Sequence, residues 1–600
     1  MGTSATTRSV DRGATNPMHR LVNRAGAGLR RDWIADIGVV LGFLVLALWV
    51  CRGLWPDPAT RELALNPEDQ ILIEWFLAVD TRVLLGDHGL LTDRLNAPDG
   101  VNLVVNATSL TLGFLLAPVT LTLGAPVSFA VLTVGNLAGT AGAWYLLFAR
   151  TFRAHRAAAA VAGGFCGFAP AMISHSNSHW HMTAQWLVPP IVWSVVRMVR
   201  AVEAAATKRV VTSGVILGVL VAVQYFLGAE VLYLTALTLA LFSLAYAVVR
   251  WRWTQRIAPW FLAGMAVAVG VGALLLAYPI WFQLAGPGSV SGGPFSPYVY
   301  SADLRSWVTF SPLSLGGTDE AERLASGPAE YNTFLGWPLL LVTAGCVVWL
   351  RRQAAVIAVA ITGVLMGVLS LGPRLVVDGE QTGIPLPYIA LVGLPVIDGA
   401  LPQRYAVAVV PLIALVLMWA IERARGLSDP GWLVVPVTIG ITLLPLFPGS
   451  LPAQQRDPVP EFISAGHWRQ CVPEGGVLVP VPLPTPPRPE PMRWAAAANA
   501  EFALPQGFFI GPYGGGGTAS MGIYPRPTSI LLADVAATGR LPVLEEGHQI
   551  QARADLAYWG ADCVAVVPGQ RYEQQLISML NDLLGPGERI ADTWVWRVST

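Results

Sequence analysis

Arginine residues gather at every second gap between long apolar runs, and no other feature constrains the fold of this chain as strongly. The cluster ahead of the first run contains Arg8, Arg12, Arg20, Arg24, Arg30 and Arg31. The later clusters are Arg150/Arg153/Arg156, Arg197/Arg200/Lys208/Arg209, Arg250/Arg252/Arg256, Arg351/Arg352 and Arg423/Arg425. Basic residues beside membrane spans stay on the cytoplasmic side. The alternation therefore predicts a chain that crosses a membrane repeatedly and keeps its N-terminus inside.

The composition agrees with a membrane protein. Hydrophobic residues make up 54% of the chain and charged residues 13%, whereas soluble domains carry about 25% charged residues. The formal net charge is zero, which argues against a nucleic-acid partner. No Walker A or Rossmann fingerprint occurs. We expect a multi-pass protein of a bacterial plasma membrane, with the lipid bilayer as its solvent.

Eleven segments are long and apolar enough to span a membrane, which takes about 17–25 residues. They are 33–51, 127–149, 157–173, 184–199, 210–227, 231–249, 258–280, 334–350, 354–371, 405–421 and 431–447. The run Leu110–Leu123 is shorter and contains Pro118, so we expect it to be an interfacial helix on the outer leaflet. This assignment leaves every arginine cluster inside and predicts an all-α polytopic bundle with its C-terminus outside.

The chain is thus expected to have three parts: a basic cytoplasmic N-terminus (1–32), a transmembrane domain (33–447) and an extracytoplasmic domain (448–600). The transmembrane part carries long outer loops at 52–126, 281–333 and 372–404. Because the inner loops are short, the outer face is where we expect the protein to act.

Residues 448–600 differ in pattern from the rest of the chain. Strands are expected at 477–481, 563–567 and near 593–598, and helices near 527–537, 547–558 and 572–584. This alternation predicts a small α/β domain. Cys471 and Cys563 both fall in it, on the side of the membrane where disulfides persist, but the sequence leaves their pairing open.

Glu68 and Asp69 are the first candidates for chemistry. They follow the first span and precede the apolar stretch 71–85, so they would lie at the membrane interface. A carboxylate there could take a proton from an acceptor hydroxyl. The alternative is structural, because acidic residues in the first turn of a helix complement its dipole.

Three of the eight histidines, His175, His179 and His181, lie between the third and fourth spans on the outer face. Imidazoles at such spacings can converge on a metal ion. They could equally donate hydrogen bonds to a phosphate or a sugar, or cap two helices without any ligand. A divalent cation is therefore one of three interpretations.

Further polar residues of the outer loops complete the candidate binding set. Arg404 and Arg374 lie beside outer ends of spans, where an arginine can pair with an anionic head group or simply extend to the interface. The remaining candidates are Glu230, Asp303, Arg305, Glu330 and Tyr331.

Several segments resemble a known family. They are EDQILIEWFLAVDTRVL (68–84), NAPDGVNLVVN (96–106), SHSNSHWHMTAQWLVPP (174–190), YSADLRSWVTFSPLSLGG (300–317), AEYNTFLGWPLLL (329–341), and LGPRL, GIPLPY and LPQRYAV within 371–407. Together with the layout of spans and loops, they resemble the GT-C membrane glycosyltransferases, within an actinobacterial-type multispan group.

The resemblance implies transfer of a sugar from a polyprenyl-phosphate donor to an envelope glycan, lipid or protein acceptor on the outer face. It assigns the catalytic base to Asp69, with Glu68 as the alternative, because this chain has Glu-Asp-Gln where the family has Asp-Asp, Asp-Glu or Gly-Asp. Arg404 would bind the leaving lipid phosphate, and the loop 281–333 would close over the donor.

Two other functions compete with the transferase. One is a transporter or flippase of a lipid-linked glycan; the absence of a sequence repeat and the position of the polar residues in loops count against it. The other is a non-catalytic envelope scaffold that holds a partner through 448–600.

Overall fold

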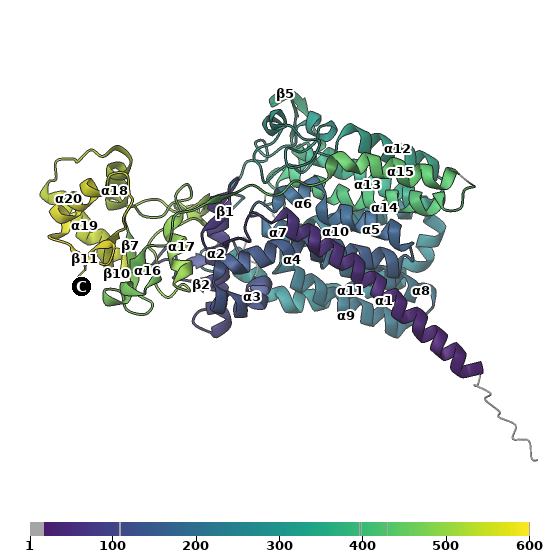
Figure 1. The fold of residues 1–600 in the computed structure, drawn as a ribbon, viewed down its shortest axis with the longest axis horizontal. Helices are drawn as coiled ribbons and strands as arrows, with labels where there is room; N and C mark the ends of the chain where they lie inside the picture. Colours follow the sequence, from purple (N-terminus) through teal and green to yellow (C-terminus); the bar gives the residue numbers. More distant parts are fainter. Residues whose placement is uncertain (1–16, 107–109, 395–396, 398, 429, 599–600) are drawn as a thin grey trace, which may run out of the picture.

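The computed structural model describes residues 17–106, 110–394, 397, 399–428 and 430–598. Residues 1–16 of the expected cytoplasmic N-terminus lie outside this range. The described chain forms a bundle of long helices with a separate C-terminal domain beyond one end of it (Figure 1).

Each of the eleven predicted spans corresponds to a helix in the described residues. These helices are α1 (Pro17–Val50), α4 (Ala125–Leu146), α5 (Arg156–Phe168), α8 (Val188–Glu203), α9 (Thr207–Tyr225), α10 (Ala229–Val249), α11 (Trp251–Ala285), α12 (Trp337–Leu350), α13 (Ala354–Ser370), α14 (Val409–Ala424) and α15 (Gly431–Leu443). Six helical segments of the described chain are long and apolar enough to cross a membrane. The prediction of a multi-pass membrane bundle is confirmed; the sidedness of the termini stays a prediction.

Small residues let neighbouring helices approach closely. On α5, a Cβ added to Gly163 or Gly167 would meet the backbone of α4 at 2.8 Å. On α9, a Cβ on Gly218 would lie 2.7 Å from the Ala268 carbonyl of α11. The Gly-x-x-x-Gly spacing of Gly163 and Gly167, repeated in Gly214 and Gly218, is the pattern by which membrane helices pack without a hydrophobic driving force.

Two helices lie between the bundle and the C-terminal domain. α2 (Pro67–Leu85) has Glu68 and Asp69 in its first turn, and α3 (Leu110–Leu123) packs against α2 and α4. The helix expected at Leu110–Leu123 is therefore present, and its place on the outer leaflet stays a prediction. Asp80 of α2 is buried against Gly113 of α3.

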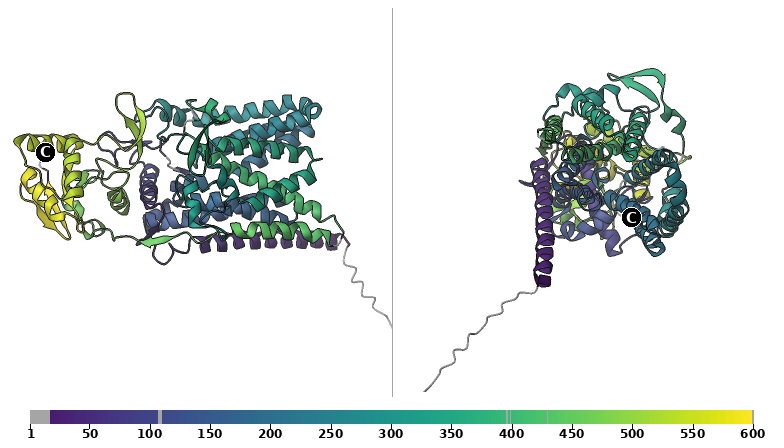
Figure 2. Two further views of the ribbon diagram at one scale, coloured as in Figure 1. Left: turned by 90° about the horizontal axis from the view of Figure 1, so that it is seen from above. Right: turned by 90° about the vertical axis from the view of Figure 1, so that its right-hand side faces the viewer.

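The C-terminal part contains a four-stranded sheet in the order β11-β12-β10-β7. Its strands are β7 (Val477–Pro480), β10 (Ala561–Val566), β11 (Glu588–Ile590) and β12 (Thr593–Arg597), with β7 parallel and β12 antiparallel to β10. Helices α18 (Pro527–Thr538), α19 (Glu546–Trp559) and α20 (Glu573–Leu584) contribute to one apolar core with the sheet. The predicted α/β domain is confirmed (Figure 2).

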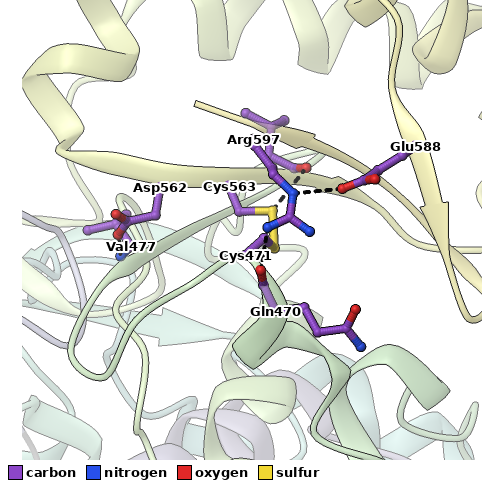
Figure 3. Close-up of a disulfide and its surroundings, with 8 residues drawn as sticks. Gln470, Cys471, Val477, Asp562, Cys563, Glu588 and Arg597 are labelled. Atoms are coloured by element: carbon purple, nitrogen blue, oxygen red, sulfur yellow. Dashed lines mark hydrogen bonds and ion pairs between the residues drawn. A yellow bond between two sulfur atoms is a disulfide. The ribbon is translucent and has the colours of Figure 1, made fainter. Parts of the chain in front are cut away.

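Cys471 and Cys563 form a disulfide with a Cα–Cα distance of 5.8 Å. It joins the segment after η7 (His467–Gln470) to strand β10. Beside it, Arg597 of β12 donates to the Gln470 carbonyl and to Glu588 (Figure 3). The bridge therefore secures the segment that enters the domain from the bundle.

The C-terminal part also holds α2 in place. Helix α17 (Glu490–Ala497) packs on α2, and Arg456 donates to both carboxylate oxygens of Glu74 at 3.0 Å. Strand β6 (Ala453–Gln455) pairs with β1 (Arg61–Leu63), just ahead of α2. The start of α2 is thus fixed at the end of the bundle that faces the domain.

Candidate active site

A cluster of charged and imidazole side chains lies at this end of the bundle. It draws on the start of α2, the segment around α6 (Pro170–His175) and α7 (Trp180–Thr183), the first turn of α10, and η5 (Pro402–Ala408). In Figure 1 the labels α2, α6 and α7 lie on the side of the C-terminal domain. Segments that are far apart in the sequence meet here, because η5 contacts α6 and α10.

Asp69 is the accessible acid of the cluster. Its Oδ2 accepts hydrogen bonds from Asn66 Nδ2 at 2.7 Å and from His179 Nε2 at 3.1 Å. Asn66 also donates to the Asn177 carbonyl at 3.0 Å, which ties the start of α2 to the histidine segment. The Asp69 side chain keeps 23% of its surface exposed, so it is oriented by the protein yet open on one side.

Arg404 forms the buried centre of the cluster. Its Nε donates to Glu330 Oε1 at 2.9 Å, and its Nη1 donates to Glu230 Oε2 at 2.6 Å. Arg404 Nη2 donates to the same Glu330 Oε1, so this oxygen accepts from two nitrogens of the guanidinium. Burial alone would raise the pKa of the Glu330 carboxyl, but Arg404 and His179 bring this pKa below its usual value. Glu330 is therefore charged and compensates Arg404, which also donates to Glu230.

The histidines connect Asp69 to Arg404. His179 Nδ1 lies 3.2 Å from His175 Nδ1 and 3.4 Å from Arg404 Nη2. If His179 carries its proton on Nε2, it donates to Asp69 while Nδ1 accepts from Arg404. Burial, followed by the charge of Arg404, lowers the pKa of His175 and of His181 well below the usual histidine range. These two rings are neutral at pH 7.

His175, His179 and Glu330 offer ligand atoms within 4.8 Å of one another, the one such group in the described residues. Arg404, however, already donates to Glu330 Oε1 and lies 3.4 Å from His179 Nδ1. A divalent cation on these atoms would lie against a guanidinium. The residues present therefore do not fit a divalent cation in this arrangement.

Five predicted site residues lie apart from the cluster. Glu68 lies close enough to Glu490 of the C-terminal part for its charge to add to the rise in the pKa of Glu490, which comes mainly from burial. Arg374 is exposed beside Tyr298, and Arg305 pairs with Asp378 at 2.7 Å. Asp303 caps η2 (Leu304–Val308), and Tyr331 is buried in an apolar cluster.

Three residues of the cluster were not singled out by the sequence. Asn66 binds Asp69, and Asn332 donates to Glu330 Oε2 at 2.8 Å. Tyr300 lies close enough to Glu330, Arg404 and Asp69 for their charges to act on it. The one available signal was the position of Asn66 directly ahead of α2, where Asn is common, although its side chain donates to the Asp69 carboxylate and does not cap the helix.

No protein-family model and no curated protein matches the chain. Among solved structures, arabinofuranosyltransferase AftD from Mycobacteria is similar with a TM-score of 0.51 and 14% identity, over 91% of this chain and 37% of that chain. Archaeal oligosaccharyltransferase AglB from Archaeoglobus fulgidus, in complex with an inhibitory peptide and a dolichol-phosphate, has a TM-score of 0.48 at 10% identity. The match covers 90% of this chain and 70% of that chain. ArnT from Cupriavidus metallidurans, bound to undecaprenyl phosphate, has a TM-score of 0.45 at 12% identity, over 94% of this chain and 97% of that chain.

At these identities the likeness concerns the fold, and the chain spans about a third of the mycobacterial protein. The bundle with its C-terminal domain has a fold similar to that of the mycobacterial arabinofuranosyltransferase, in agreement with the fold that the resemblance in the sequence implies.

Proposed function

We propose that the protein transfers a sugar from a polyprenyl-phosphate donor to an envelope glycan, lipid or protein acceptor on the outer face of the membrane. The observation that carries the proposal is Asp69, partly exposed and held between Asn66 and His179 at the edge of a buried ion-pair cluster. The GT-C fold supports it.

In the proposed reaction Asp69 is the base. The acceptor oxygen forms a bond to the anomeric carbon of the donor sugar while the bond from that carbon to the phosphate oxygen breaks. The acceptor proton passes to Asp69, and the polyprenyl phosphate leaves with the bonding electrons. The hydrogen bonds from Asn66 and His179 to Oδ2 leave Oδ1 free to accept that proton.

Arg404 is proposed to act chiefly by holding the cluster together. Of its five N–H groups, those on Nε and Nη2 face Glu330 and His179, and one on Nη1 faces Glu230. One N–H on Nη1 remains for an oxygen of the donor phosphate. A single charge-assisted hydrogen bond of this kind would stabilise the negative charge that develops on the leaving group.

Two observations support placing the proposed active site on the outer face of the membrane. The Cys471–Cys563 disulfide lies in the C-terminal domain at the same end of the bundle as Asp69, and disulfides persist outside the cytoplasm. The arginine clusters after α4, α8, α10, α12 and α14 fall at the opposite end, as expected for cytoplasmic loops.

The loop 281–333 is proposed to cover the donor. Ser291 of this loop pairs with the C-terminal hairpin β8 (Ile510–Tyr513) and β9 (Thr518–Met521): its N–H donates to the Gly517 carbonyl at 2.8 Å, and its carbonyl accepts from Ala519 at 3.0 Å. This pairing would let the C-terminal domain hold the loop closed and exclude water during transfer.

The test is a donor assay. The purified protein is placed in proteoliposomes with a panel of radiolabelled polyprenyl-phosphate sugars and an envelope glycan extract, and labelled acceptor and released polyprenyl phosphate are measured. Asp69→Asn is the test variant, and Asp93→Asn is its matched control, because Asp93 is an exposed acid of the same loop. Transfer by the wild type and by Asp93→Asn, together with its loss in Asp69→Asn, supports the proposal. Movement of label between leaflets without transfer supports the flippase, and binding alone supports the scaffold.

A further inference from the structure

A cavity of about 330 Å³ lies among α8, α9 and the segment after α4, and its lining carries three arginines. It is lined by Thr151, Trp193, Arg197, Arg200, Ala201 and Arg209. We call it the arginine pocket. Arg200 lies near the C-terminal end of α8, whose N-terminal end follows the histidine segment. The pocket is therefore at the opposite end of the bundle from Asp69.

The charge of the arginine pocket is uncompensated. Within the part of the chain that the structure describes, no carboxylate forms an ion pair with Arg197, Arg200 or Arg209. Arg209 lies in the first turn of α9, which has no acidic residue, and the positive end of a helix dipole disfavours a cation there. Three guanidinium groups around one cavity can bind an anion that has several acceptor oxygens, such as a phosphate.

The local backbone orients one of these arginines. After α4 the chain forms a π-helical turn, Leu147–Thr151, of a kind that often accompanies functional sites. Its Thr151 carbonyl accepts from Arg200 Nη2 at 2.9 Å, while Arg197 lies over the Trp193 ring at 5.2 Å. Arg200 and Arg197 are thus each held by a neighbour at the pocket wall.

The surroundings indicate a lipid rather than a soluble anion. The side chains of Val211, Val215 and Val219 are exposed at four-residue spacing along α9, so the helix that carries Arg209 has an apolar side suited to lipid. Trp193 has the amphipathic ring typical of the membrane interface. The basic clusters at this end place the pocket at head-group level.

We propose that the arginine pocket binds the phosphate head group of an anionic membrane lipid, with its acyl chains in the surrounding bilayer. This site is distinct from the proposed active site and does not depend on it. The three arginines would surround the phosphate oxygens, and Trp193 would pack against the glycerol region.

The test measures binding of short-chain phosphatidylglycerol to the full-length protein in neutral detergent by native mass spectrometry. Short-chain phosphatidylcholine and inorganic phosphate are the comparison ligands. The test variant is Arg197→Gln/Arg200→Gln/Arg209→Gln. The control variant is Arg250→Gln/Arg252→Gln/Arg256→Gln, which removes three arginines of another basic cluster at the same end of the bundle.

The proposal predicts saturable binding of phosphatidylglycerol over phosphatidylcholine, weakened by about tenfold or more in the test variant and unchanged in the control variant. Equal binding by the wild type and the test variant would overturn the site, as would equal losses in the two variants. Inorganic phosphate that binds as tightly as phosphatidylglycerol and displaces it would overturn the assignment to a lipid.

Discussion

Removal of the Cys471–Cys563 disulfide should destabilise the C-terminal domain by a predictable amount. The bridge closes a loop with a sequence separation of 92 residues. In the chain-entropy model, closing such a loop in the unfolded state stabilises the folded protein by about 4.6 kcal/mol, and measured effects lie between about 2 and 5 kcal/mol. Cys471→Ser/Cys563→Ala is the appropriate variant, because Cys563 is fully buried and a hydroxyl there would lack a partner.

Hydrogen exchange measures this loss locally. In the oxidised protein, amides of β10 and β12 are protected by the paired register Val564–Trp596 and Ala565–Val595. A loss of about 2–5 kcal/mol corresponds to exchange about 30- to 4000-fold faster at these amides in the double variant. Cys346→Ala is the control, because Cys346 is a free buried cysteine of α12 and its loss should leave β10 unchanged.

Two results would refute this reasoning. Unchanged exchange of β10 and β12 in the double variant would show that the bridge does not limit opening of the domain. Free thiols at both positions in protein isolated from membranes, detected by alkylation and mass spectrometry, would contradict the disulfide and the outer placement of the domain together.

Three further predictions address packing, pH and metals. Burial raises the pKa of the Asp80 carboxyl well above its usual value, so native Asp80 stays protonated where the unfolded chain ionises, and stability falls as the pH rises above about 3.9. Asp80→Asn should therefore raise the melting temperature more at pH 8 than at pH 5, and an equal effect at both would contradict this. Gly163→Ala should cost about 1–3 kcal/mol because the new Cβ would lie 2.8 Å from the Tyr145 nitrogen, whereas Gly135→Ala, with nothing within 4 Å, should cost nothing in the same unfolding assay. Because Arg404 contacts the atoms that a divalent cation would need, transfer should survive exhaustive chelation, and a loss restored by Mg²⁺ or Mn²⁺ would show the opposite.

The helices and the C-terminal domain could be predicted because their signals are local. Apolar runs of sufficient length can form only buried or lipid-facing helices, and all eleven coincide with helices of the described chain. The sequence could raise the pairing of Cys471 with Cys563 as a possibility but could not decide it, because the pairing depends on β10 lying beside the segment that enters the domain.

The site was predictable as a set of residues but not as a set of contacts. The arginine pattern brings the outer loops to one face, which is why Asp69, His179 and Arg404 share one end of the bundle. Their partners depend on tertiary packing across 74 and 174 residues, as in the bonds from Arg404 to Glu330 and Glu230. Tyr331 was among the residues predicted for the site, but its ring packs in an apolar cluster beside Phe334. The sequence alone does not distinguish a tyrosine of the site from one that packs beside it.

The most direct test of the proposed mechanism compares Asp69→Asn with Glu68→Gln at saturating donor and acceptor. The two acids are adjacent in α2, but of the two only Asp69 contacts His179 and Asn66, whereas the charge of Glu68 acts on Glu490 of the C-terminal part. General-base catalysis contributes about 10²- to 10⁴-fold. We predict that kcat falls by such a factor in Asp69→Asn while Glu68→Gln stays within about threefold of the wild type. Full activity of Asp69→Asn, or a large loss confined to Glu68→Gln, would contradict the assignment of Asp69 as the base.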